Sequence, residues 1–93
     1  MITKEFRKRF KSSLGDKFSY SPPVKLILQD MGVKNRNGEP YSSQSIRNVF
    51  NGKRGNEAVE IAILQCYKNA IEQRYKLESL KKSLTNPPEG ENQ

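Results

Sequence analysis

The sequence predicts an all-α fold: one small domain of four helices, with a long C-terminal helix and an extended loop before the third. Two observations lead to this prediction. A chain of 93 residues has room for one such domain. Apolar side chains also recur at three- and four-residue intervals, in segments bounded by glycine, proline or capping residues. We expect the domain to span residues 1–85, followed by a disordered tail over 86–93, where proline, glycine and polar residues prevail.

The first two predicted helices are amphipathic, and each ends at a glycine. Helix 3–14 stops at Gly15 and carries its apolar face at four-residue steps, on Phe6, Phe10 and Leu14. Helix 22–31 follows Ser21, which we expect to be its N-cap, and has two prolines in its first turn. It stops at Gly32, which we expect to be a left-handed cap. Its apolar face has the clearest helical period in the chain and consists of Val24, Ile27, Leu28 and Met31.

An extended loop leads to a short third helix. The pair Asn37-Gly38 favours a type I′ turn, so the loop is either a plain connection or a very short basic hairpin. The third helix is predicted over 43–51, with Ser42 as its N-cap and Gly52 at its end. A hydrophobic staple supports this start, formed by Tyr41 and Ile46.

The fourth helix is predicted over 57–84, with Asn56 as its N-cap and the charges of Glu57 and Glu60 complementing the helix dipole. At 1.5 Å per residue it would measure roughly 40 Å, too long to pack on so small a core over its whole length. We expect Cys66 to be a small core residue. A heptad pattern predicts either a homodimer seam, a solvated extension or packing on the first helix, and it runs through Ile63, Cys66, Ala70, Gln73, Leu77, Leu80 and Leu84.

The composition argues against most catalytic and metal-binding functions. With no His and one Cys, the chain can assemble neither a zinc site nor a Ser-His or Cys-His catalytic pair. The carboxylates are scattered, and no GxxxxGK[ST] phosphate loop is present. We therefore expect no enzyme activity, no cofactor and no metal. The longest apolar run, 61–64, is too short to cross a bilayer, and a single Cys fits a reducing cytoplasm.

Positive charge is concentrated in the first part of the chain. Residues 1–56 contain 12 Lys or Arg against 4 Asp or Glu, whereas residues 57–93 contain 5 and 6. The first part is therefore expected to face a polyanion, and the second to serve as scaffold or oligomerisation element. Nucleic acid is the commonest such polyanion. An acidic membrane surface is the rival, but it would favour a basic amphipathic helix with an uninterrupted apolar face.

The third helix carries side chains that can recognise bases. On a helical wheel, its apolar residues leave the opposite face to Gln44, Arg47, Asn48 and Asn51. Amide groups pair with adenine and guanidinium groups with guanine in the major groove, so we predict that these four residues contact bases. The alternative is that they form an ordinary solvated face.

Phosphate contacts are expected on both sides of this helix. Lys53 and Arg54 precede the N-terminus of helix 57–84, where free N–H groups can meet a phosphate oxygen, although Glu57 and Glu60 would repel an anion there. The further predicted phosphate contacts are Ser42, Asn56, Lys34 and Arg36. Weaker flanking contacts are expected from Arg7, Lys8 and Lys11.

The segment 43–54, SQSIRNVFNGKR, followed by a capped helix with Ala62-Ile63-Leu64, resembles the recognition helix and third helix of lac-repressor-type headpieces. More broadly, it resembles the lambda-repressor-like helix-turn-helix regulators of bacteria and phages. The resemblance covers about residues 43–66, a quarter of the chain. It implies that Ser43, Gln44 and Asn48 reach base edges and that Lys53 and Arg54 contact the DNA backbone.

Two features depart from that family. About eleven residues separate Met31 from Ser43, where a helix-turn-helix has three or four. Either the insertion forms an extended turn or small wing beside the groove, or the geometry of the motif is altered enough to abolish entry into the groove. No effector-binding domain follows, so DNA binding is the property that the resemblance implies, and sugar sensing is not.

We therefore expect a helix-turn-helix protein that binds double-stranded DNA with sequence preference through helix 43–51. It would be a bacterial or phage transcriptional regulator in the cytoplasm, on the nucleoid or in an infected host, with helix 57–84 partly a homodimerisation element. We expect no membrane partner and no small-molecule effector. The alternative is a helical protein–protein interaction or phage structural module that does not read DNA sequence. RNA binding ranks third, because the four Tyr and four Phe form no evident stacking platform.

Overall fold

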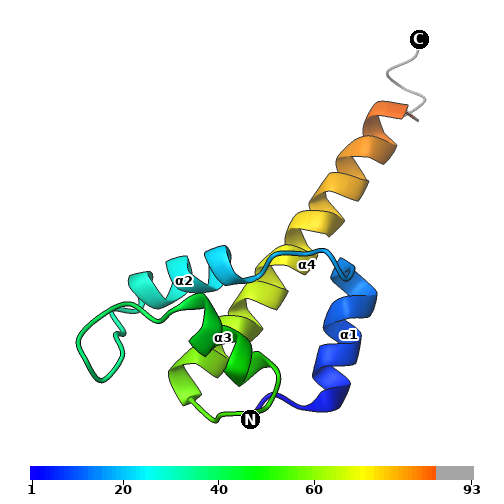
Figure 1. Cartoon of the computed structure of the whole chain (residues 1–93). Coiled ribbons are helices and arrows are strands. Elements are labelled where there is room, and N and C mark those ends of the chain that lie inside the picture. Colours follow the sequence, from blue (N-terminus) through cyan, green and yellow to red (C-terminus); the bar gives the residue numbers. More distant parts are fainter. Residues whose placement is uncertain (86–93) are drawn as a thin grey trace.

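The computed structural model describes residues 1–85. It has four helices, which in chain order are α1 (Lys4–Leu14), α2 (Ser21–Asp30), α3 (Ser43–Phe50) and α4 (Glu57–Thr85) (Figure 1). No strand occurs within this described part of the chain. The all-α prediction and the order of the four helices are confirmed, and each helix begins and ends within one residue of the predicted position. The tail expected over 86–93 lies outside the described residues.

Two predicted N-caps are confirmed. The Ser42 Oγ accepts a hydrogen bond from the Ser45 N–H at 3.1 Å, and so begins α3. The Asn56 Oδ1 accepts one from the Val59 N–H, also at 3.1 Å, and so begins α4. Each cap satisfies one of the backbone donors that the first turn of a helix leaves without a partner.

The predicted glycine stops are also confirmed. Gly32 and Gly52 both have positive φ, at 70° and 76°. At the end of α3, the Gly52 N–H donates to the Val49 carbonyl at 3.1 Å, and the Lys53 N–H donates to the Asn48 carbonyl at 2.9 Å. This pair of hydrogen bonds is the Schellman motif, which needs a left-handed residue that glycine adopts without steric cost.

The prediction that Ser21 caps α2 is wrong. Ser21 is the first residue of the helix, and the cap position belongs to Tyr20, whose side chain makes no capping hydrogen bond. Two prolines follow Ser21, and neither Pro22 nor Pro23 has an N–H that could donate a hydrogen bond to the serine hydroxyl. The next N–H, that of Val24, donates to the Tyr20 carbonyl at 3.0 Å instead.

The predicted type I′ turn is also wrong. A type I′ turn needs positive φ at both central residues, whereas Gly38 has φ of 77° and Asn37 does not share that conformation. The side chain of Asn35 shapes the turn instead, since its Oδ1 accepts from the N–H of Asn37 at 2.9 Å and of Glu39 at 3.0 Å. The Asn35 N–H also donates to the Glu39 carbonyl at 2.8 Å. The loop thus closes like a hairpin, but without strands.

The core is built where α2 and α3 pack against the first half of α4. Its twelve buried residues include the predicted Cys66, and they are Ile2, Phe10, Leu14, Val24, Leu28, Ile46, Val49, Phe50, Val59, Ala62, Ile63 and Cys66. Met31, expected on the apolar face of α2, is 41% exposed because it lies at the C-terminal cap of that helix. No polar or charged side chain is buried in the described residues.

Phe10 joins α1 to the rest of the core. The centroid of its ring lies 5.1 Å from the ring centroid of Phe50 on α3. Four more ring centroids lie between 5.6 and 6.0 Å away, those of Phe6, Phe18, Tyr20 and Tyr67. Aromatic pairs at such separations are more favourable than their buried area alone implies. One side chain thus holds α1, the segment before α2, α3 and α4 together.

The second half of α4 projects from this core (Figure 1). Every residue from 72 to 84 is exposed, and the molecule measures 62 Å along its long axis but 27 and 18 Å across it. The prediction that α4 is too long to pack along its whole length is therefore confirmed. Its root is fastened to the end of α1, because Arg74 donates hydrogen bonds to the carbonyls of Ser13 at 3.0 Å and Leu14 at 2.9 Å.

Candidate nucleic-acid interface

The outward face of α3 carries uncharged amides and one guanidinium. Ile46, Val49 and Phe50 are buried against the core, which turns Gln44, Arg47 and Asn51 to solvent and leaves Ser43 and Asn48 half-buried. Gln44, Arg47 and Asn48 thus lie on the side of α3 away from its core residues, and Asn51 follows as the C-terminal cap of the helix. Ser43 lies at the edge of the core-facing side, three residues before Ile46. An eight-residue helix with such a face is small enough to enter a major groove.

Gln44 and Asn48 are joined by a hydrogen bond. The Gln44 Nε2 donates to the Asn48 Oδ1 at 3.0 Å, across one turn of the helix. The pair holds both amides in a defined orientation, while the Gln44 Oε1 and its second N–H can still face a base edge. The same pair type occurs on α4, where Gln65 donates to Asn69 at 2.9 Å. The amide pair alone therefore does not distinguish α3.

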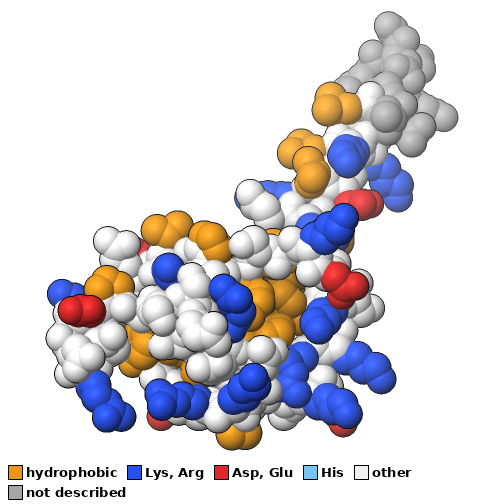
Figure 2. Space-filling model, in the orientation of Figure 1, with side chains coloured by type: hydrophobic (Ala, Val, Ile, Leu, Met, Phe, Trp, Pro, Cys, Tyr) orange, Lys and Arg blue, Asp and Glu red, His pale blue; other side chains and the backbone are white. Residues whose placement is uncertain are grey.

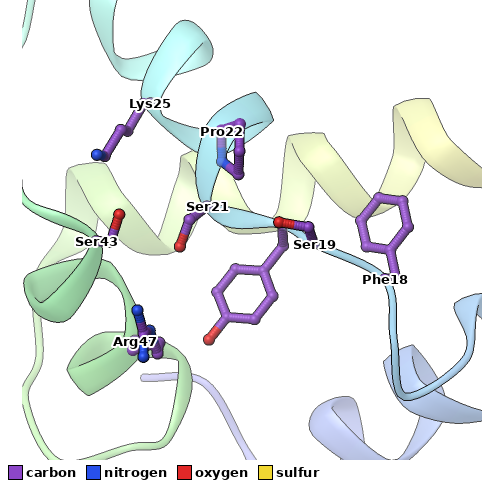
Figure 3. A pocket seen from close by; sticks show the side chains of 8 residues that line it. Phe18, Ser19, Ser21, Pro22, Lys25, Ser43 and Arg47 are labelled. Carbon is purple, nitrogen blue, oxygen red and sulfur yellow. The ribbon is translucent and has the colours of Figure 1, made fainter.

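A hollow with a volume of about 430 Å³ lies on the α2 side of this face. Figure 3 shows Ser43 and Arg47 from α3 lining it together with Lys25 and Ser21 from α2. Two cations and several hydroxyls, those of Ser19, Ser21, Ser43 and Tyr20, thus line a space next to the predicted base contacts, a chemistry that suits a phosphate oxygen. Tyr20 also lines the hollow, and burial raises the pKa of its hydroxyl while the charge of Arg47 opposes that shift.

Lys25 is a site residue that was missed from the sequence. It follows Val24 on α2 and is exposed, and nothing in its neighbourhood along the chain connects it with α3. The spacing between Ser21 and Lys25 places both near one face of the helix, but only the packing of α2 on α3 brings them to Arg47.

A second hollow, of about 410 Å³, lies on the other side of α3. Arg36 from the loop and Arg54 from the α3–α4 connection both line it, next to Ser45. The structure thus brings together two of the predicted phosphate contacts that are distant in sequence. Lys34 lines a different hollow, against α2, and Lys53 is exposed. In Figure 2 the Lys and Arg side chains spread along the lower edge of the body, from the loop to α1.

Two other predicted phosphate contacts have side chains engaged within the protein. Besides accepting from Ser45, the Ser42 hydroxyl donates to the Ser45 Oγ at 3.0 Å. The Asn56 Nδ2 donates to the Tyr41 hydroxyl at 3.0 Å, and its Oδ1 caps α4. Both side chains therefore shape the ends of helices, and their contact with phosphate stays a prediction.

The acidic residues at the start of α4 differ in their surroundings. The Glu60 carboxylate pairs with the amino group of Met1 and accepts from the Asn56 N–H at 3.0 Å. These contacts lower the pKa of Glu60, the hydrogen bond from the amino group most, while partial desolvation opposes them. The repulsion that we expect from Glu60 toward a phosphate is therefore offset by its own cation, whereas Glu57 is exposed.

The expected flanking cations on α1 divide in the same way. Lys8 and Lys11 are exposed, but Arg7 is half-buried and bonded to backbone carbonyls.

In the described residues no cluster of His, Cys, Asp and Glu could hold a metal ion. None of the four helices combines the length and the hydropathy that crossing a bilayer requires.

Comparison with family models, with curated proteins and with solved structures gives no match for this chain. The evidence for function is therefore the geometry of α3 and its two flanking hollows.

Proposed function

We propose that this chain binds double-stranded DNA with sequence preference, as a helix-turn-helix regulator of bacterial or phage type. In this proposal α3 enters the major groove, where Gln44, Arg47, Asn48 and Asn51 contact bases and Ser43 lies beside them. Lys53, Arg54, Arg36, Lys34 and Lys25 contact the phosphates on either side.

The observation that carries the proposal is the placement of the amide face between two cation-bearing hollows. Lys25 lines the hollow on one side of α3, next to Arg47 of the face itself, and Arg36 and Arg54 line the hollow on the other. A helix in a major groove has a phosphate strand on each side, so this arrangement complements DNA better than cations on one flank would. The Gln65 and Asn69 pair on α4 has exposed neighbours of mixed charge and no such flanks.

The loop between α2 and α3 does not prevent this arrangement. Twelve residues, 31–42, separate the two helices, yet α2 and α3 pack directly against each other. The hairpin-like turn at 35–39 displaces the extra residues to one side, where Arg36 lies beside Arg54 in the second hollow. In this proposal the insertion is a small wing next to the groove.

A second candidate function, a helical interaction module that does not read DNA sequence, is favoured by the exposed leucines of α4. Leu77, Leu80 and Leu84 are 53, 58 and 80% exposed. Exposed apolar rows of this kind mark contact sites for other proteins. The two candidates differ in whether DNA sequence alters the affinity.

The test is selection of DNA sites by the full chain from a random duplex library, followed by fluorescence anisotropy of selected and random duplexes across a salt series. We expect enriched sites that stay bound at physiological salt, with log K falling linearly in log salt for both duplexes. Failure to enrich any sequence, with binding lost above low salt, would favour the interaction module.

Gln44→Ala tests the base contact directly. We expect it to reduce the preference for selected over random duplex by about 1–3 kcal/mol. Gln65→Ala is the matched control, because it removes the same kind of amide pair from an exposed face of α4. An equal loss on both duplexes for Gln44→Ala would exclude its base-contacting role.

A further inference from the structure

The projecting half of α4 continues the core-facing side of that helix beyond the core. Cys66 is buried and Ala70 half-buried. Continuing at steps of three and four residues from Ala70 gives Gln73 and then three leucines. These leucines, Leu77, Leu80 and Leu84, are here named the leucine row. Residues spaced in this way share one face of a helix. The leucine row therefore points to the same side as the α4 core residues, but nothing in the described residues covers it.

A groove lies on that same side of the molecule, between α2 and α4. This α2–α4 groove has a volume of about 490 Å³ and is lined mainly by apolar side chains, including Phe18, Pro23, Leu26, Ile27 and Ala70. Leu26 is 64% exposed. A smaller hollow shares Gln73 with the groove and extends it along α4 to Leu77 and Leu80. In Figure 2 the orange side chains of the projecting helix and those along the top of the body face the same corner.

We propose that two copies of this chain pair through this corner, with their α4 helices antiparallel and each leucine row in the other copy's α2–α4 groove. In this register the partner's Leu77 lies opposite Gln73, and the partner's Leu80 lies opposite Ala70. The partner's Leu84 covers Leu26. Each of the first two layers pairs one apolar position of the heptad on one helix with the other apolar position on the partner helix, as knobs-into-holes packing of antiparallel helices requires.

The shapes of the two surfaces indicate a second copy as the occupant. The leucine row and the α2–α4 groove lie next to each other on one molecule. A two-fold axis near residue 75 therefore places each copy's leucine row in the other copy's groove and covers both surfaces in both copies. The small side chain of Ala70, which lines the α2–α4 groove, leaves room for the partner's Leu80. A closed pair of this kind also stops at two copies.

Charge in the same register supports this occupant. Glu72 and Lys76 lie on one flank of the leucine row, and Arg74 and Glu78 lie on the other. Antiparallel pairing brings like flanks together, so Glu72 lies within one turn of the partner's Lys76, and Glu78 within one turn of the partner's Arg74. Four complementary pairs result, against two like-charge pairs next to the axis, Lys76 with the partner's Lys76 and Arg74 with the partner's Arg74. Such pairs add little affinity but fix the register, whereas an anionic surface would meet the carboxylates as well.

The first test is sedimentation equilibrium of the full chain without DNA, at concentrations up to about 1 mM. We expect a monomer–dimer equilibrium that Leu80→Glu or Leu26→Glu weakens at least about 100-fold, since each dimer loses two buried leucines. Leu64→Glu is the matched control, because Leu64 is a 48% exposed leucine on the opposite face of α4. A chain that stays monomeric, or a dimer that Leu80→Glu leaves unchanged, would overturn the proposal.

The second test measures the direction of pairing. Nitroxide labels on Ser83→Cys, in a Cys66→Ala background, should lie about 25 Å apart in the antiparallel dimer, since each is eight residues from the axis. A parallel pair would place them about 10 Å apart, and that distance would contradict the register. Both tests are made without DNA, so a failure of the proposed DNA binding and a failure of the dimer are distinguishable.

Discussion

The guanidinium of Arg7 donates a hydrogen bond at 3.3 Å to the carbonyl oxygen of Phe50, the last residue of α3. The same Nη1 donates to the Ile2 carbonyl, also at 3.3 Å. The end of α3 is thereby fixed to α1 and to the N-terminal segment. A residue that looks in the sequence like one more surface cation is therefore part of the support of the candidate interface.

Arg7→Met should destabilise the fold. The substitution keeps an apolar stem but removes a charged donor from two carbonyls, which we expect to cost about 1–3 kcal/mol of unfolding free energy. Urea denaturation followed by circular dichroism measures this difference. Arg9→Met is the control, because Arg9 lies on the same helix and is exposed. Equal effects of the two substitutions would show that the bonds to Ile2 and Phe50 are not stabilising.

Glu60 should make stability fall in acid. Its pKa is lowered in the folded state below the ordinary value of 4.5, so its stabilising contribution is complete above that value and is lost as the pH falls through the folded pKa. We expect Glu60→Gln to be less stable than the original chain at pH 7 and nearly as stable once the pH lies below the folded pKa of Glu60. Glu57→Gln is the control, because it removes an exposed carboxylate from the same first turn without touching the contacts to Met1 and Asn56. A deficit for Glu60→Gln that persists in acid would contradict the assignment.

Lys53→Ala should weaken binding to every DNA sequence alike. A phosphate contact carries no sequence information, so we expect the same fractional loss on selected and random duplexes and a salt slope lower by about one. Fluorescence anisotropy across a salt series measures both. Lys68→Ala, on an exposed position of α4, serves as the control. A loss confined to the selected duplex would assign Lys53 to base recognition instead.

Asn35→Ala should loosen the turn beside Arg36. The Asn35 side chain accepts from the N–H groups of Asn37 and Glu39, and without it both amides should exchange with solvent several-fold faster. Hydrogen exchange followed by NMR measures each amide. Asn69→Ala removes an amide bonded only on the surface of α4 and should leave the turn unchanged. Unaltered exchange at Asn37 and Glu39 would mean that the backbone holds the turn by itself.

The helix ends show why local structure was predictable and where it was not. Ser42, Asn56 and Gly52 act through bonds to backbone groups within four residues, and such bonds depend on little besides the neighbouring sequence. The predictions for Ser21 as an N-cap and for a type I′ turn at Asn37 also rested on local sequence, but residues next to these positions gave the backbone other hydrogen bonds. Pro23 has no N–H to donate to Ser21, and the Val24 N–H donates to the Tyr20 carbonyl instead. The Asn35 Oδ1 accepts from the Asn37 and Glu39 N–H groups and closes the turn without a left-handed Asn37.

The sequence by itself determined the four helices, the buried face of α3 and therefore its outward amides, because a period of 3.6 residues fixes which side chains share a face. Only the tertiary structure decided which cations flank that face. In the folded chain Lys25 lines one hollow with Arg47, and Arg36 lines the other with Arg54. Arg7 and Arg74 bond α1 to α3 and α4, and Glu60 pairs with the amino group of Met1. These groups meet because the packing of the core around Phe10 and Phe50 brings distant segments together, and spacing along the chain carries no record of such contacts.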